Sequence, residues 1–151
     1  MRVGGYAVFE ERAFRARIRR DKVHLIVPAQ NPHPDGWEAS SRYGYWLKTV
    51  PRLNVSRLFY VRTVAMLDGL SVGVVDMDEA AATVVVWADA FYSGPDPALH
   101  PDLSWVADNG STLWAGTVAI DRLIDIDEPE YEVEVNSRYV PEPVWYPRQP
   151  G

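Results

Sequence analysis

Three histidines and several clustered carboxylates are the side chains of this sequence that could support acid–base chemistry or bind a metal ion. The histidines are His24, His33 and His100, and the last two are each followed by proline. Their spacing matches no metal-binding motif, and no cysteine is present to supply a thiolate ligand. The sequence also lacks a serine in a nucleophile-elbow pattern and a glycine-rich phosphate-binding loop. We therefore expect no catalytic residue, no metal and no cofactor.

Paired carboxylates are abundant in the second half of the chain. They form two clusters, one of Asp76, Asp78 and Glu79 and one of Asp121, Asp125 and Asp127. A general acid and a general base need different environments inside a pocket, and the sequence shows neither. The first cluster also lacks the spacing of a calcium-binding loop. Both clusters therefore predict a solvated acidic face rather than an active site.

The charges of this chain divide sharply between its two halves. Residues 1–61 hold 11 Lys and Arg against 5 Asp and Glu, whereas residues 62–151 hold 4 against 16, which gives net charges of +6 and −12. A surface this acidic repels nucleic acid and attracts cationic partners over long range. We therefore expect no nucleic-acid partner. The alternative is that the two halves neutralise each other within the fold.

The two halves align as two copies of one unit. Residues 6–10 align with residues 64–68 at an offset of 58, and the block 23–27 aligns at an offset of 60. Trp46 aligns with a second tryptophan at an offset of 68, and the block 55–58 aligns at an offset of 65. Because the blocks keep the same order, the sequence predicts an internal duplication with insertions in loops.

Alternating apolar and polar residues predict short β-strands in each copy. In residues 13–19, Phe14, Ala16 and Ile18 alternate with arginines, which is typical of a strand with one buried and one solvated face. The expected strands are 6–10, 13–19, 22–28, 43–50 and 57–61 in the first copy and 63–68, 70–76, 82–88, 112–118 and 122–126 in the second. We expect a turn at Asp68-Gly69, between the first two strands of the second copy. Five strands with one helical turn before the last predict an all-β protein of two tandem SH3-like barrels. A single β-sandwich of the same strands is the alternative.

We expect three parts along the chain. Residues 1–61 form the basic first unit, residues 62–128 form the acidic second unit, and residues 129–151 form an edge strand followed by a tail. The edge strand is predicted at residues 131–135, where apolar and acidic side chains alternate. Four prolines lie beyond residue 140, and proline donates no hydrogen bond to a sheet.

The longest expected loop, residues 88–110, combines aromatic side chains with carboxylates. Long loops inside compact domains often carry function, and aromatic anchors among charged residues are typical of binding hot spots. The predicted partner-binding residues are Asp89, Phe91, Tyr92, Asp96, Asp102, Trp105 and Asp108. The alternative is that the loop folds over its own barrel and serves only to cap it.

The pattern of the first copy resembles small duplicated β proteins of bacteria that are encoded beside secreted or polymorphic toxins and act as immunity proteins. It is carried by Tyr6, Ala7, Phe9, Phe14, Ala16, Val23, Leu25, Gly36, Trp37, Tyr45, Lys48, Val50, Val55, Leu58 and Val61. Residues 64–126 follow the pattern more loosely and lack both the glycine–aromatic pair and the strand lysine. The resemblance implies an inhibitor that binds and occludes a cognate toxin and has no catalytic residues of its own.

Three functions are compatible with the sequence. The first is neutralisation of a protein toxin with a basic cleft, and the second is a scaffold or regulatory module that binds a peptide or another domain. The third is a small-molecule-binding barrel, which needs a concave pocket. We expect a protein that is not an enzyme and is cytoplasmic, with no membrane partner, because the N-terminus lacks a signal-like apolar stretch and no apolar run approaches the length of about 20 residues that spans a membrane.

Overall fold

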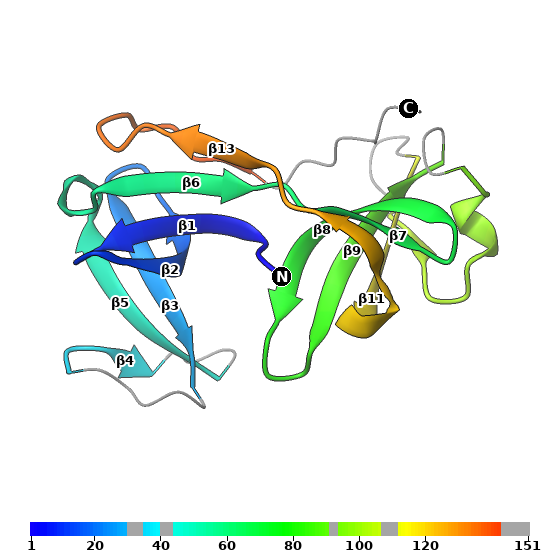
Figure 1. Ribbon diagram of the computed structural model, residues 1–151, viewed down its shortest axis with the longest axis horizontal. Helices are drawn as coiled ribbons and strands as arrows, with labels where there is room; N and C mark the ends of the chain where they lie inside the picture. The colour runs from blue at the N-terminus through cyan, green and yellow to red at the C-terminus, as the bar shows by residue number, and fades with distance from the viewer. Residues whose placement is uncertain (30–34, 40–43, 91–93, 107–111, 143–151) are drawn as a thin grey trace. The chain divides into compact units, whose positions relative to one another are not determined.

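The computed structural model describes residues 1–29, 35–39, 44–90, 94–106 and 112–142 (Figure 1). In these residues the chain forms thirteen β-strands and three single turns of 3-10 helix, arranged in two antiparallel sheets. The prediction of an all-β protein is confirmed. None of the helical turns in the described part of the chain is long enough or apolar enough to cross a membrane.

The chain divides into two compact units, each built around one sheet. The first unit comprises Gly4–Val61 together with Glu130–Glu142, and the second comprises Met1–Val3 together with Arg62–Pro129. Each unit therefore takes a short segment from the far end of the chain. In particular, the strand expected near residue 131 belongs to the first unit although it follows the second in sequence.

The first sheet has seven strands in the order β13-β6-β1-β2-β3-β5-β4. Their bounds are β1 Gly4–Phe9, β2 Arg12–Ile18, β3 Lys22–Pro28, β4 Glu38–Ala39, β5 Tyr45–Pro51, β6 Arg57–Val61 and β13 Glu130–Val133, and the 3-10 turn η1 is Arg52–Asn54. Figure 1 shows β13 lying along β6, at the edge of this sheet.

The second sheet has six strands in the order β10-β11-β9-β8-β7-β12. Their bounds are β7 Val64–Leu67, β8 Leu70–Asp78, β9 Thr83–Asp89, β10 Ser104–Trp105, β11 Leu113–Ala119 and β12 Ile124–Asp127, and the 3-10 turns are η2 Pro97–Leu99 and η3 Ile120–Arg122. The order β12-β7-β8-β9-β11-β10 of this sheet repeats the order β6-β1-β2-β3-β5-β4 of the first sheet. A 3-10 turn immediately precedes both β6 and β12 in sequence. Within the described chain, β13 is the one strand of the first sheet without a counterpart.

Both sheets are open, whereas we expected closed SH3-like barrels. The strands at one edge of the two sheets, β4 and β10, have only two residues each and pair on one side, with β5 and β11. Such short strands provide too few hydrogen bonds to close a barrel. Each sheet lies in its own compact unit, which corresponds to the tandem arrangement rather than to a single sandwich.

Matching two-residue turns join the first two strands of each repeat. Glu10 and Glu11 connect β1 to β2, and Asp68 and Gly69 connect β7 to β8; all four have positive φ angles, between 49° and 84°. Two consecutive left-handed residues fit the right-handed twist of a hairpin. The turn expected at Asp68-Gly69 is confirmed.

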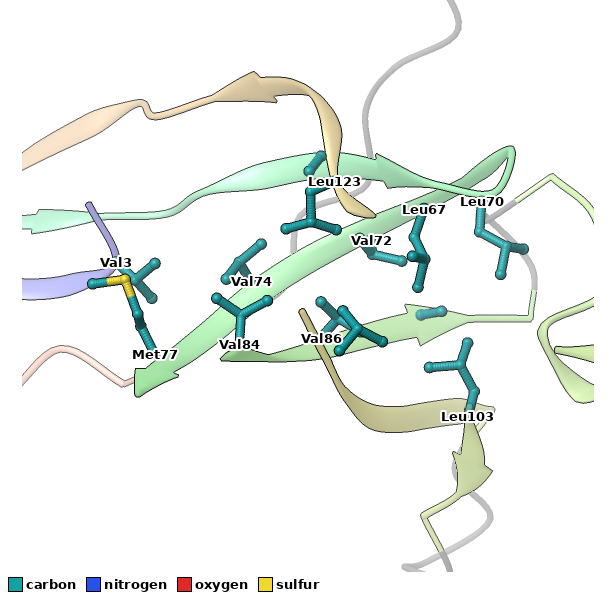
Figure 2. Close-up of a cluster of buried hydrophobic side chains, with 13 residues drawn as sticks. Val3, Leu67, Leu70, Val72, Val74, Met77, Val84, Val86, Leu103 and Leu123 are labelled. Atoms are coloured by element: carbon teal, nitrogen blue, oxygen red, sulfur yellow. The ribbon is translucent and has the colours of Figure 1, made fainter. Parts of the chain in front are cut away.

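Each unit buries its own apolar cluster on one face of its sheet. In the second unit, Val84, Val86 and Ala88 alternate with more exposed residues along β9, and Leu103 from the long loop joins them (Figure 2). In the first unit the buried cluster consists of Ala7, Phe14, Ala16, Ile18, Val23, Leu25, Trp37, Val50, Val55, Leu58 and Val133. The inward positions of Phe14, Ala16 and Ile18 agree with the alternation in the sequence.

The core shows that our alignment of the third strand is wrong by one residue. Val23 and Leu25 are buried in the first unit, and their counterparts by burial are Val84 and Val86, an offset of 61 rather than 60. A register shift in β8 after Val74 supplies the extra residue. Because strand side chains alternate between faces, a slip of one residue would have turned every core residue outward.

The alignment at the last strand is also wrong. Val55 and Leu123 each end a 3-10 turn, and each is buried in the core of its unit. They are therefore counterparts at an offset of 68, rather than the 65 that the sequence indicated. This offset equals the one that relates Trp46 to Trp114 in the preceding strands, so no insertion separates the two elements.

A buried arginine fastens the segment after β13 to the first unit. Arg52, in η1, has the largest of the fully buried side chains, with 1% of its surface exposed. All five of its N–H bonds have an acceptor: Nε donates to Val135 O (3.0 Å), Nη1 to Arg19 O (2.9 Å) and Tyr139 O (2.7 Å), and Nη2 to Glu134 O (2.8 Å) and Ser137 Oγ (3.2 Å). The second unit has Ile120 at the equivalent position, and its described residues include no counterpart of β13.

We expect Arg52→Ala to destabilise the first unit by about 3 kcal/mol, because it leaves buried carbonyl groups without donors. Limited proteolysis and urea unfolding would measure the effect, and we expect faster cleavage between residues 134 and 139. The matched control is Arg57→Ala, which removes an exposed pair with Glu132 and Glu130 on the same segment and should have a much smaller effect. Equal unfolding midpoints for Arg52→Ala and the unmodified chain would contradict this role.

Candidate functional site

The residues predicted to bind a partner lie in the second unit and are only partly described. Asp89, Asp96, Asp102 and Trp105 are in the described part of the chain. Phe91, Tyr92 and Asp108 lie outside the described residues. The structure therefore shows the local contacts of four of these side chains, and partner binding by all seven stays a prediction.

Two of the aspartates shape the long loop. Asp89 ends β9, and its Oδ2 accepts a hydrogen bond from Thr112 Oγ1 (3.0 Å), which ties the two ends of the loop together. Asp96 caps η2 by accepting a hydrogen bond from the Ala98 N–H (3.0 Å). These two carboxylates hold the loop in place, whatever else they contact.

The described part of the loop folds onto its own sheet. Leu103 inserts into the core of the second unit, and Pro97 is buried. The backbone at Asp102 passes so close to β11 that a Cβ atom on Gly116 would lie 2.0 Å from Asp102 O. Only glycine allows this approach. The alternative that the loop covers its own unit is thus what the described residues show, although the unit is a sheet and not a barrel.

Hydrogen bonds among four side chains join this loop to the rest of the second unit. The four residues are Asp68, His100, Asp102 and Arg122. His100 Nε2 lies 2.7 Å from Asp68 Oδ2, and the same oxygen accepts a hydrogen bond from Arg122 Nη2 at 2.6 Å. Arg122 Nη1 also donates to Asp102. His100 Nδ1 accepts from the Asp102 N–H (3.1 Å), which assigns the ring proton to Nε2. The hydrogen bond from His100 lowers the pKa of Asp68, and Arg122 lowers it further.

This network is built for structure rather than for proton transfer. Both ring nitrogens of His100 are engaged, and its side chain is only 6% exposed. A general base needs a nitrogen within reach of its substrate. From the sequence we considered His100 as a metal ligand and missed its contact with Asp68. The only feature of the sequence that marks Asp68 is its position in an Asp-Gly turn.

Exposed apolar side chains lie beside this network on the same loop. Leu99, in η2, is 82% exposed, and Trp105, in β10, is 52% exposed. Trp105 lies opposite Trp114 in the β10–β11 pair, while Trp114 packs against the core. Trp105, a predicted aromatic anchor, therefore lies at the edge of the second sheet, beside a tryptophan that packs against the core.

A second exposed apolar site, which the sequence analysis missed, lies at the opposite edge of the same sheet. All four residues of β12 are exposed, with Ile124 at 60% and Ile126 at 43%. Asp125 has a positive φ of 51°, and the pairing with β7 shifts register between Ile124 and Asp127. The alternation of isoleucine and aspartate was visible in the sequence, but the exposure of this strand was not.

Glutamates from the second half of the sequence pair with a basic side chain of the first unit, which is the neutralisation that the sequence left open. Arg57 forms ion pairs with Glu130 and Glu132 of β13, within the first unit itself. On the same sheet, His24 Nδ1 lies 2.8 Å from Thr49 Oγ1. Burial lowers the pKa of His24, and the nearby cations lower it further, so His24 is predominantly neutral at pH 7.

No metal site emerges from the described part of the chain. Among these residues, no three His, Asp or Glu side chains are placed to hold one ion. His33, one of the three histidines considered as ligands, lies outside the described residues.

Comparison with known proteins adds no relative to this description. No family model, no curated protein and no solved structure matches the chain. The class that the structure defines is an all-β protein of two compact units with repeated strand order.

We expect Asp68→Asn to lower the free energy of unfolding of the second unit at neutral pH. We also expect this free energy to depend less on pH in the acid range than it does in the unmodified chain. The lowered pKa of Asp68 means that its ionised form stabilises the folded state above the ordinary aspartate pKa, and that this contribution is lost as pH falls through the folded-state value. Urea unfolding between about pH 7 and pH 2 would measure it. Asp121→Asn, on exposed η3, is the matched control. Parallel pH profiles for Asp68→Asn and the unmodified chain would contradict the prediction.

Proposed function

We propose that this chain is a non-catalytic protein of the immunity type, which captures a basic partner protein through its second unit and occludes the partner's active cleft. The partner would be a cognate toxin. This proposal joins the resemblance of the sequence pattern to the charge and exposed apolar groups of the second unit.

The charge that remains on each unit after folding carries the proposal. Within the first unit, 11 Lys and Arg face 9 Asp and Glu, because residues 130–142 bring four glutamates and one arginine to the basic segment 4–61. Met1–Val3 and Arg62–Pro129 hold 3 Lys and Arg against 12 Asp and Glu. The net charges are thus +2 and −9, and Arg148 accounts for the remainder of the total of −6.

A strongly acidic unit with exposed apolar groups suits a protein that must capture a cation-rich enzyme quickly. Long-range attraction raises association rates by orders of magnitude at low salt. Exposed side chains such as Trp105 and Leu99 then supply the apolar contacts that slow dissociation. Nucleases and other enzymes that bind polyanions have basic clefts, and the acidic unit would occupy such a cleft in place of the substrate.

A non-catalytic scaffold module is the second candidate. The observation that favours it is the exposed edge strand β12, since edge strands bind extended peptides without inhibiting anything. The two candidates differ in what happens to the partner's activity.

Affinity capture from the native lysate, followed by an activity assay, tests the proposal. We expect a basic protein to be retained in stoichiometric amount at about 50 mM salt and to be released near 500 mM, because screening weakens ionic attraction. The purified partner should arrest growth or degrade its substrate alone, and equimolar chain should abolish that activity. A partner that stays fully active in the complex would favour the scaffold function instead.

Two variants would separate the charge contribution from the apolar contribution. We expect Asp121→Lys to slow association with the captured partner about tenfold at low salt and to leave dissociation nearly unchanged. Trp105→Ala should instead speed dissociation by about tenfold or more. Glu38→Lys makes the same charge change in the first unit and is the matched control. Equal association rates for Asp121→Lys and Glu38→Lys would contradict capture by the second unit.

A further inference from the structure

We infer that the outer edge of β12 is a strand-addition site that accepts a basic, extended segment of another protein. This inference deepens the proposed function, on which it rests for the identity of the partner as a cationic protein. It adds backbone pairing at one strand to the contacts made by the acidic surface.

The first unit shows how the equivalent edge is covered. There β6 lies between β1 and β13, whereas in the second unit β12 pairs with β7 alone within the described residues. At the offset of 68 that relates these strands, Leu58 corresponds to Ile126. Leu58 is fully buried, while Ile126 is 43% exposed. Among the residues that the structure describes, the second unit therefore repeats the architecture of the first without the strand that completes it.

The charges of the two edges predict the charge of the missing strand. In the first unit, Arg57 of β6 pairs with Glu130 (3.4 Å) and with Glu132 of the added strand. In the second unit β12 carries two aspartates, Asp125 and Asp127, and no basic residue. Because the charge of the accepting edge is reversed, the incoming strand should carry lysine or arginine where β13 carries glutamate.

The same charges disfavour pairing of β12 with β12 or β13 of a second copy. A second copy of β12 would bring aspartates opposite aspartates, and β13 of another copy would bring glutamates opposite them. The register shift and the left-handed Asp125 bend the strand, which also discourages pairing between identical edges. The edge is thus selective for an extended segment of opposite charge from a different protein.

The other strand edges of the described chain are poorer acceptors. β4 and β10 offer two residues each. The glutamates of β13 already pair with Arg57. In contrast, β12 offers four residues, and its exposed Ile124 and Ile126 provide apolar contacts for alternate side chains of an added strand.

Two synthetic peptides test the inference without any knowledge of the natural partner. One has the sequence of residues 129–135, Pro-Glu-Tyr-Glu-Val-Glu-Val, and the other carries Glu130→Lys, Glu132→Lys and Glu134→Lys. We expect the lysine peptide to bind the full-length chain at least tenfold more tightly than the glutamate peptide. Amide NMR should show new protection from hydrogen exchange at residues 124–127 and no change at β6.

Two variants sharpen the test. Ile126→Pro removes a backbone donor from β12 and should abolish the protection, while Asp127→Lys should reverse the preference between the peptides. The NMR spectrum of each variant verifies that the second unit is folded. Lysine-peptide shifts spread over the acidic surface, with no protected β12 amides, would overturn strand addition. Amides of residues 124–127 that face away from β7 but are already protected in the free chain, or a dimer lost on Ile126→Pro, would also overturn it.

The outcomes for the edge and for the proposed function are distinguishable. If a captured basic partner is still bound and inhibited by the Ile126→Pro chain, the proposed function stands and strand addition is wrong. If the lysine peptide pairs with β12 but no captured protein is inhibited, strand addition stands and the immunity function is wrong.

Discussion

The buried guanidinium of Arg52 is the contact on which the organisation of this protein depends. Its five N–H donors are used to hold four backbone carbonyls and one hydroxyl, and three of those carbonyls belong to the segment that follows β13. A buried charge is tolerated only when its hydrogen bonds are complete, so this segment has one stable position. Through it, β13 is held beside β6, and one edge of the first sheet is closed to other strands. At the equivalent position the second unit has Ile120, which organises no such segment.

The same contact determines how charge is distributed over the molecule. By placing an acidic strand on the basic unit, it brings the first unit close to neutrality and leaves the second unit strongly negative. Arg57 completes this arrangement by pairing with two glutamates of the added strand. The two units therefore present different surfaces although they repeat the same order of six strands. The first unit has a covered edge and a small net charge, while the second unit has an exposed edge and a large negative net charge.

Sequence patterns predicted the local elements well and their long-range completion poorly. The alternation around Phe14 and Ala16 and the turn at Asp68-Gly69 depend on neighbouring residues, and both were found. The alignment of Val23 failed because the register shift after Val74 has no local composition signal. Arg52 was missed because its acceptors are mainly backbone carbonyls, which any residue supplies, and three of them lie more than 80 positions away in sequence. Similarly, the close approach of Asp102 to Gly116 depends on a loop path that composition does not specify.

The exchange of terminal segments between the units also governs the order in which the protein is completed during synthesis. Synthesis runs from the N-terminal side, so Gly4–Val61 emerges early, yet β13, the strand that finishes its sheet, emerges only after Arg62–Pro129. All six strands of the second sheet lie before Pro129. The second sheet therefore has all of its described strands before the first one does, and Arg52 lacks most of its acceptors until residues 134–139 are translated.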